Sequence, residues 1–238
     1  MPSNIYLLYL LGFLPSFIWL LFYLRKDSHP ESNKMVLKIF IYGMFSAVLA
    51  IFLERKYRLA HNLFSAATAN IAAVSLIVSG AAIEEIVKYL AAWLGAFRNK
   101  ELDEPIDVML YMIIAALGFA ALENILVLTR FYPGLATGKA LEVSFWRFIS
   151  ATFLHALCSG ALGYFLALSF CRRNKRWLLV LLGLGISIGL HSAYNWAIME
   201  TQGIEKLLLP ILILIVLGCL VGYWFKKLKK LKSVCIIK

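Results

Sequence analysis

Long apolar segments alternate with short polar loops along almost the whole chain. A membrane-spanning helix needs roughly 20 apolar residues. The pattern predicts such helices at residues 4–24, 35–53, 62–80, 82–97, 108–129, 147–171, 177–199 and 207–225. Only Ser79-Gly80 separates the third segment from the fourth, so these two form a tight hairpin, a kinked helix or a re-entrant pair. We therefore expect an all-α, polytopic transmembrane bundle with eight spans, or seven as the alternative.

The composition places this bundle in the cell membrane. Of the 238 residues, 62% are hydrophobic and 16% are charged, whereas a soluble domain averages about 45–50% and about 25%. The net charge of +11 does not indicate nucleic acid, because the basic residues lie in short runs between apolar segments and in the tail "KKLKKLK" from Lys226. Membrane topology and anionic lipid explain such runs. We expect one integral-membrane domain over residues 1–238, with the lipid bilayer as a partner.

Lysine and arginine in the loops set the orientation, because they are enriched on the cytoplasmic side. The run "RRNKR" (172–176) and the C-terminal tail are two spans apart, so both are expected in the cytoplasm. With eight spans, "ERKYR" (54–58) joins them and the basic first loop (25–38) lies outside, which counts against that model. With seven spans these two loops exchange sides. From residue 108 onward both versions agree, and the C-terminus is cytoplasmic.

A few ionisable residues lie inside the apolar segments. They are Glu84, Glu85, Lys88, Glu123, His155 and His191. An ionisable group at the centre of a spanning helix costs about 2.5–3.5 kcal/mol on insertion scales. If each of these groups faced lipid, the summed free-energy cost of insertion would be too high. We therefore expect them to converge on one cavity that contains water.

The depth of these residues supports convergence. At about 1.5 Å per helical residue, Glu123 lies roughly 22 Å and His191 roughly 21 Å above the cytoplasmic start of their spans. His155 lies roughly 12 Å below the outer face, so all three fall in the outer half of the membrane. Asn195 and Ser159 follow His191 and His155 by four residues, and each therefore shares a helix face with its histidine.

Structural interpretations compete with functional ones at each position. Glu84 or Glu85 could form an ion pair with Lys88, while the other glutamate, rotated by about 100°, faces a cavity. A single buried histidine is more often a hydrogen-bonding group between helices than a catalytic one. The whole set at one depth favours function over structural pairing.

Four motifs in this part of the chain together resemble a known family. The segments "EEIVKY", "GFAALENIL", "HALCSGALGYFL" and "GLHSAYN" are similar to the motif set of the PrsW family of intramembrane proteases, which is related to the CAAX-prenyl proteases. The resemblance covers about residues 80–200. It departs from the family at Val108, where glycine is usual, whereas Asn195, where aspartate is also common, fits the wider superfamily.

The resemblance implies hydrolysis of a peptide bond within the membrane. The substrate would be a membrane-anchored protein cut near the outer face, and in this family the best-described role is the first cut of an anti-sigma factor. The expected depth of the ionisable residues in the outer half agrees with that side and does not depend on the resemblance.

For the chemistry we expect a water molecule activated by Glu84 or Glu85. His155 would orient the water or shuttle the proton, and Glu123 would hold a histidine or share the proton. His191 and Asn195 would stabilise the oxyanion. Lys88 and Asn124 are supporting residues.

No cofactor is favoured, because HExxH is absent. The alternative is zinc bound by the histidines and glutamates. Two further alternatives are an ion or proton transporter with a helix interrupted at Gly80, and a non-catalytic membrane scaffold.

Overall fold

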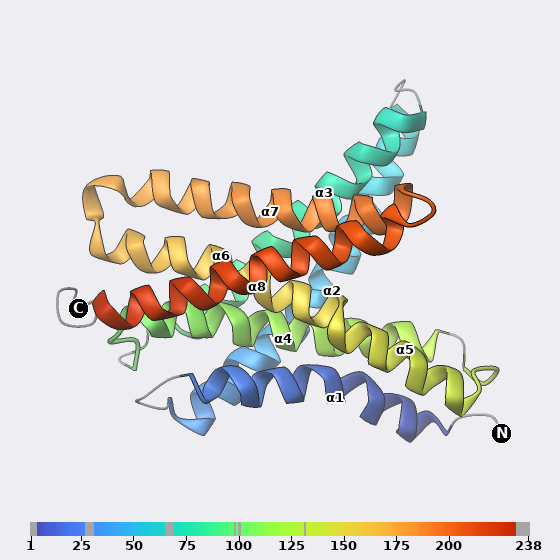
Figure 1. Ribbon diagram of the computed structural model, residues 1–238, viewed down its shortest axis with the longest axis horizontal. Coiled ribbons are helices and arrows are strands. Elements are labelled where there is room, and N and C mark those ends of the chain that lie inside the picture. Colours follow the sequence, from blue (N-terminus) through green and yellow to red (C-terminus); the bar gives the residue numbers. More distant parts are fainter. Residues whose placement is uncertain are drawn as a thin grey trace.

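The computed structural model describes residues 4–26, 31–64, 69–97, 99, 101–130 and 132–231. Within these ranges the chain is helical apart from short connections and contains no β-strand (Figure 1). The elements are α1 (Ile5–Leu24), α2 (Asn33–Phe64), α3 (Ala69–Gly95), α4 (Pro105–Thr129), α5 (Thr137–Ile149), α6 (Ala151–Cys171), the 3-10 turn η1 (Arg173–Lys175), α7 (Arg176–Glu200) and α8 (Glu205–Leu231). The expected all-α class is confirmed.

Among the described residues, seven helical stretches are long and apolar enough to cross a membrane, with α5 and α6 counted as one. This count corresponds to the seven-span alternative, because the segments expected at 62–80 and 82–97 lie in one continuous helix, α3. Ser79-Gly80 does not interrupt it, and the Ser79 hydroxyl donates to the carbonyl of Leu76 (3.2 Å). Glycine disfavours a helix by only about 1 kcal/mol, and lipid offers the backbone no hydrogen-bonding partner outside the helix.

With α3 as a single helix, most of the basic residues of the loops lie on one side of the membrane. The ends of α1, α6 and α8 lie at one end of the bundle, at the left in Figure 1. With seven spans, the basic residues Arg25, Lys26, Lys34 and Lys38, the segment 172–176 and the basic end of α8 all lie at this end, and the segment 54–58 lies at the other. The predicted cytoplasmic side is therefore the end where α8 finishes.

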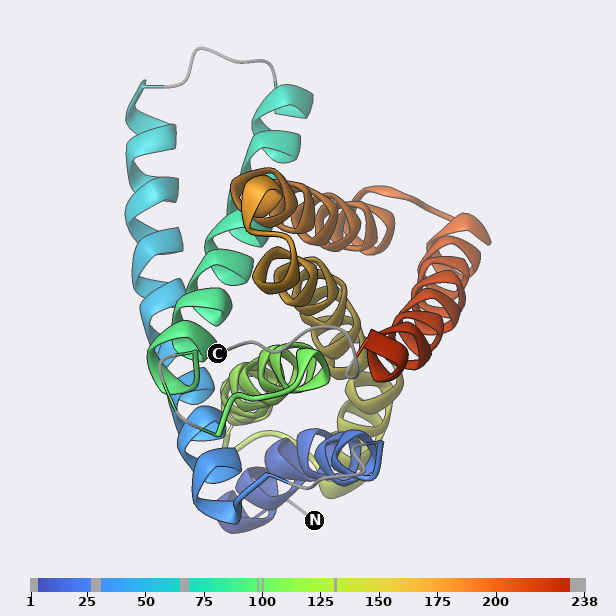
Figure 2. The same ribbon diagram turned by 90° about the vertical axis from the view of Figure 1, so that its left-hand side faces the viewer.

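Helix α4 occupies the centre of the bundle, between α1, α2 and α6 (Figure 2). Every residue from Pro105 to Ala121 is buried, as expected for a helix that is apolar on all sides. Where α2 crosses α4, a Cβ added to Gly118 would lie 2.0 Å from the carbonyl oxygen of Phe40, and one added to Gly43 would lie 2.0 Å from that of Ala115. These two glycines let the helix backbones touch.

Helices α2 and α3 form a hairpin whose connected end diverges from the other helices, at the upper right in Figure 1 and at the top of Figure 2. Besides α2, α3 packs against α7, α4 and α6. One face of α3 is therefore held against three helices that contribute to the site described below.

Helix α5 is amphipathic and lies against α1, where the Ser144 hydroxyl donates to the carbonyl of Leu11 (2.8 Å). The backbone leaves the helical conformation at Ser150 (φ −120°, ψ −92°) before α6 begins. The sequence placed one span at 147–171, but Arg147 belongs to the last turn of α5. This boundary matters because it directs the Arg147 side chain towards the site.

Candidate active site

The ionisable residues expected to converge do meet at one place in the bundle. Glu84, Glu85 and Lys88 come from α3, Glu123 from α4, His155 from α6 and His191 from α7. The two histidine rings are 5.1 Å apart between centroids and nearly perpendicular. Four helices therefore each contribute at least one polar group to a single cluster.

Glu85 is fully buried, and its carboxylate is surrounded by donors. One oxygen, Oε1, accepts from Lys88 Nζ (2.6 Å) and pairs with His191 Nδ1 (2.8 Å). The other, Oε2, accepts from the hydroxyls of Ser187 (2.7 Å) and Ser159 (3.3 Å). With four partners from three helices, Glu85 joins α3 to α6 and α7.

Lys88 carries a fully buried ammonium group. Besides its bond to Glu85, Nζ lies 3.0 Å from His155 Nδ1 and 3.7 Å from Glu84 Oε2. It also sits 4.8 Å from the centre of the Phe119 ring. Lys88 therefore pairs closely with Glu85 and leaves Glu84 more open, so the two adjacent glutamates have different surroundings.

The orientation of the His155 ring is fixed by a contact to its other nitrogen, Nε2. Its Nε2 lies 2.9 Å from Glu123 Oε2, and Arg147 Nη2 lies 3.0 Å from the same oxygen. Arg147 Nε donates to the side-chain oxygen of Asn124, whose amide nitrogen donates to the Thr152 hydroxyl (3.0 Å). This network ties α4, α5 and α6 together behind His155.

Glu84 faces the open side of the cluster. Its side chain is 16% exposed, and Oε2 has no hydrogen-bond partner although it lies within 3.7 Å of His155 Nδ1 and 3.8 Å of His191 Nε2. In each histidine the opposite ring nitrogen is engaged by a carboxylate, Glu123 or Glu85. The remaining nitrogens of both rings thus lie within 3.8 Å of one carboxylate oxygen, and that of His155 is also held by Lys88, whose Nζ is nearer to it (3.0 Å).

These three residues also form a potential metal-binding set. One ligand atom from each of Glu84, His155 and His191 lies within 4.8 Å of one from each of the others. Metal-binding histidines usually donate their second N–H to a carboxylate or carbonyl, and both histidines have a carboxylate there. The donor set of two imidazoles and a carboxylate is one that zinc uses in catalytic sites, with a fourth position left for water. The donor types fit such a metal, and binding it would require Lys88 Nζ to release His155 Nδ1, which now lies 3.0 Å away.

A cavity of about 410 Å³ leads away from this cluster. Its inner wall includes Glu84, Glu123 and both histidines, and it continues between α5 and the second half of α7, where Asn195 and Tyr194 line it. At its rim Lys139 pairs with Glu142 (2.8 Å). Asn195 therefore shares the cavity with His191, whereas Glu85 and Lys88 lie behind its wall.

Sequence reasoning did not identify several residues of this network. In the sequence, Arg147 marks only the start of a span. Ser187 and Thr152 give no signal, because hydroxyl residues are common in apolar helices. Arg147 is the residue that could have been found, since it is a charged residue at the end of an amphipathic helix. Ser159 was noted as a neighbour of His155, but its bond is to Glu85.

The cluster and the bundle define a multi-pass membrane protein with a buried carboxylate–histidine site, and the comparisons with known proteins identify its family. A family model described as "PrsW family intramembrane metalloprotease" matches residues 31–222. The Protease PrsW of Geobacillus kaustophilus is 32% identical over 182 residues, 76% of this chain and 74% of its own length. That of Bacillus subtilis is 27% identical over 221 residues, 90% and 89% of the two chains. No solved structure matches.

The chain belongs to the PrsW family of intramembrane proteases. The resemblance that the four motifs indicated is thereby confirmed, and the protein is a membrane-embedded peptidase.

Proposed function

We propose that the chain cuts a membrane-anchored protein at the point where Glu84, His155 and His191 face the cavity. One observation carries this proposal: both imidazoles are fixed by carboxylates, and their other nitrogens lie within 3.8 Å of the unbonded Oε2 of Glu84, with that of His155 also contacted by Lys88. Hydrolysis needs an activated water, a group that stabilises the oxyanion and a proton for the leaving amine. This side of the cluster is open to a cavity, so water and a peptide can both reach it.

The fit of these residues to a metal moves our proposal from the metal-free chemistry expected from the sequence to the zinc alternative. Glu84, His155 and His191 would hold the ion, and Glu85 and Glu123 would orient the two histidines. When bound there, zinc would lower the pKa of a water molecule and polarise the peptide carbonyl. In the metal-free alternative, Glu84 takes the water proton and passes it to the leaving amine.

The remaining residues position these groups. Glu85 fixes the ring of His191, and Glu123, whose charge Arg147 balances, fixes the ring of His155. Asn195 lines the cavity one helical turn beyond His191, where its amide can donate to the developing oxyanion. Lys88 neutralises Glu85 inside the bundle.

The location of the cavity supports a substrate that is cut near the outer face. Its lining includes the start of α5 and the second half of α7, at the end of the bundle that the basic loops assign to the outside. A protein anchored by one spanning helix could bring the segment that follows its span into this cavity. Within the family resemblance, an anti-sigma factor is our proposed substrate.

The transporter alternative favours discontinuous helices, and Gly80, the expected place for an interruption, lies inside the continuous helix α3. The scaffold alternative differs from our proposal in one measurable outcome, which is whether a substrate is cut.

The test compares two glutamates that line the same cavity. Wild type, Glu84→Gln and Glu142→Gln are reconstituted with model substrates that carry one spanning helix, and new termini are identified by mass spectrometry. Because Glu84 belongs to the reacting cluster and Glu142 to the rim, Glu84→Gln should lose at least about 10²–10³ in rate, with Glu142→Gln close to wild type. Wild-type cleavage by Glu84→Gln contradicts the proposed site.

Metal dependence is tested separately on purified protein. We expect about one zinc ion per chain in wild type and in Glu142→Gln, and loss of the ion in His191→Ala. Chelation should abolish cleavage and added zinc should restore it. Full activity in protein that contains no bound metal would support the metal-free chemistry and leave Glu84 as the base.

A further inference from the structure

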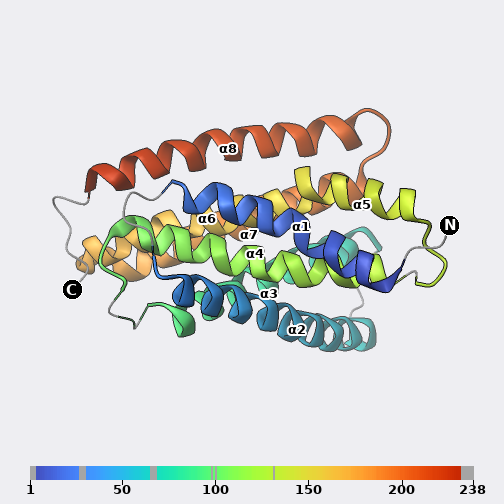
Figure 3. The ribbon, with the colours of Figure 1, turned by 90° about the horizontal axis from the view of Figure 1, so that it is seen from below.

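A second cavity lies between α1 and α8, and its lining shares no residue with the cavity at the site. Both helices pack on α4 and α6, but no close backbone contact joins α1 to α8 in the described part of the chain. Figures 2 and 3 show α8 standing apart from α1. The space between them measures about 680 Å³, larger than the cavity at the site. Within its lining, the ring of Tyr23 from α1 stacks on that of Phe225 from α8, with the ring centroids 5.9 Å apart. The two helices therefore meet there through side chains.

The walls of this groove are apolar and aromatic. On one side Trp19 stacks on Phe153 of α6, with ring centroids 4.2 Å apart. On the other side Gly218 and Gly222, one turn apart on α8, present no side chain. A Cβ at Gly222 would meet no atom within 4 Å, and one at Gly218 would only touch Phe153 at 3.6 Å. The two glycines therefore keep the groove open.

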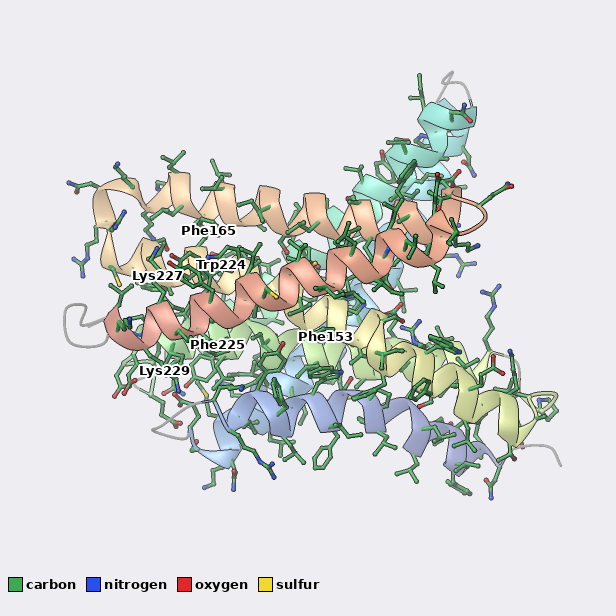
Figure 4. All side chains as sticks on the ribbon, viewed as in Figure 1. Phe153, Phe165, Trp224, Phe225, Lys227 and Lys229 are labelled. Atoms are coloured by element: carbon green, nitrogen blue, oxygen red, sulfur yellow. The ribbon has the colours of Figure 1, made fainter. Side chains whose placement is uncertain are left out.

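Three lysines surround one end of the groove: Lys26, which follows the end of α1, and Lys226 and Lys229 from α8. All three are exposed, and within the described residues no carboxylate pairs with them. Figure 4 shows Phe225 and Lys229 on the side of α8 that faces α1, with Lys227 on the other side. Lys227 instead lies over the Tyr164 ring (5.7 Å).

The dimensions of the groove match one membrane leaflet. From Gly218 to Lys229, α8 rises about 16 Å, which is about half of the roughly 30 Å hydrocarbon core. The lysines lie at the end where α8 finishes, so they reach the depth of lipid headgroups on the predicted cytoplasmic side. An acyl chain would occupy the apolar part while the phosphate contacts the ammonium groups.

We propose that this groove binds an anionic phospholipid of the leaflet on that side. Charge complementarity selects the occupant: three ammonium groups without acidic partners favour a headgroup with net negative charge over a zwitterionic one. Neither the catalytic cluster nor its cavity contributes a residue to this groove, so the inference is independent of the proposed function.

The first test uses a matched pair of double variants. Lys226→Gln/Lys229→Gln removes two groove charges, and Lys227→Gln/Lys230→Gln removes two charges from the same helix outside the groove. Lipid binding to the detergent-purified protein is titrated by native mass spectrometry with phosphatidylglycerol and with phosphatidylcholine of the same chains. We expect the groove variant to bind phosphatidylglycerol about 25-fold more weakly, at about fivefold per lysine, and the control to bind as wild type does.

The second test fills the groove and leaves its charges in place. Gly222→Leu should abolish the phosphatidylglycerol adduct, and Gly185→Leu on α7, where an added Cβ also meets nothing within 4 Å, should not. Equal weakening in both lysine pairs, equal binding of the two lipids, or an unchanged adduct in Gly222→Leu would overturn the proposal. So would a complex with the mass of two chains that the groove variants abolish, because the occupant would then be a second copy.

Discussion

Adjacent residues on α3 have separate tasks because successive helical side chains point about 100° apart. Glu85 points between α6 and α7, and its carboxylate is hydrogen-bonded to four partners. Glu84 points to the cavity, and one of its oxygens has no hydrogen-bond partner. The structural and the functional interpretations of "EE" both apply, each to a different residue. The pairing interpretation describes Glu85 with Lys88, and our proposed chemistry uses Glu84.

This difference predicts different effects on stability. Glu85→Gln leaves the Lys88 charge buried without its closest partner, which should lower the free energy of unfolding by about 3–5 kcal/mol. The double variant Glu85→Gln/Lys88→Met removes both charges and should recover much of that loss without recovering activity. Thermal unfolding in detergent measures both effects, with Glu84→Gln as the matched control. A Glu85→Gln protein as stable as wild type would contradict the pairing described above.

At the same scale, the sequence revealed those site residues that are conspicuous in an apolar segment. Glu84, Glu123, His155 and His191 could be found because a charge or an imidazole in a spanning helix demands an explanation. Ser187 and Thr152 could not, because a hydroxyl can satisfy its own helix backbone and occurs there without a role. A single sequence also does not show how the helices pack, so it could not show which of the two glutamates faces the cavity.

Among the elements, the apolar pattern predicted the positions of the helices well, but it did not predict the roles of the glycines. The dipeptide Ser79-Gly80 was interpreted as a boundary, although it lies inside α3 with open space around Gly80. Gly43 and Gly118 gave no signal, yet they set the closest approach between α2 and α4. Only the neighbouring helix distinguishes a glycine that ends an element from one that lets two elements touch.

Alanine substitution separates the two kinds of glycine. Gly118→Ala places a methyl group against the backbone of α2, so it should destabilise the protein by about 1–3 kcal/mol. Gly80→Ala adds a methyl group in open space and should be neutral or stabilising by up to about 1 kcal/mol. The midpoints of thermal unfolding in one detergent give the comparison. A lower midpoint for Gly80→Ala than for Gly118→Ala would mean that the helix crossing is placed incorrectly.

For the whole molecule, seven spans predict a definite topology. A reporter after Lys230 should be cytoplasmic and one after Gly138 external, in either version of the spans. A reporter after Asn62 decides between the versions, because seven spans place it outside and eight place it inside. Reporters active only on one side of the membrane provide the measurement. An external tail would put the cavity on the cytoplasmic side and remove the outer-face substrate from our proposal.

The dependence of Glu85 on α7 has a consequence for biosynthesis. The chain is made from its N-terminus, so α3 enters the membrane with Glu85 and Lys88 well before Ser187 and His191 have been translated. Until α7 arrives, Glu85 lacks two of its four partners and the cluster lacks one of its two histidines. Until α7 has inserted, the site of the protease is therefore incomplete, and proteins that insert beside the growing chain are not exposed to its activity.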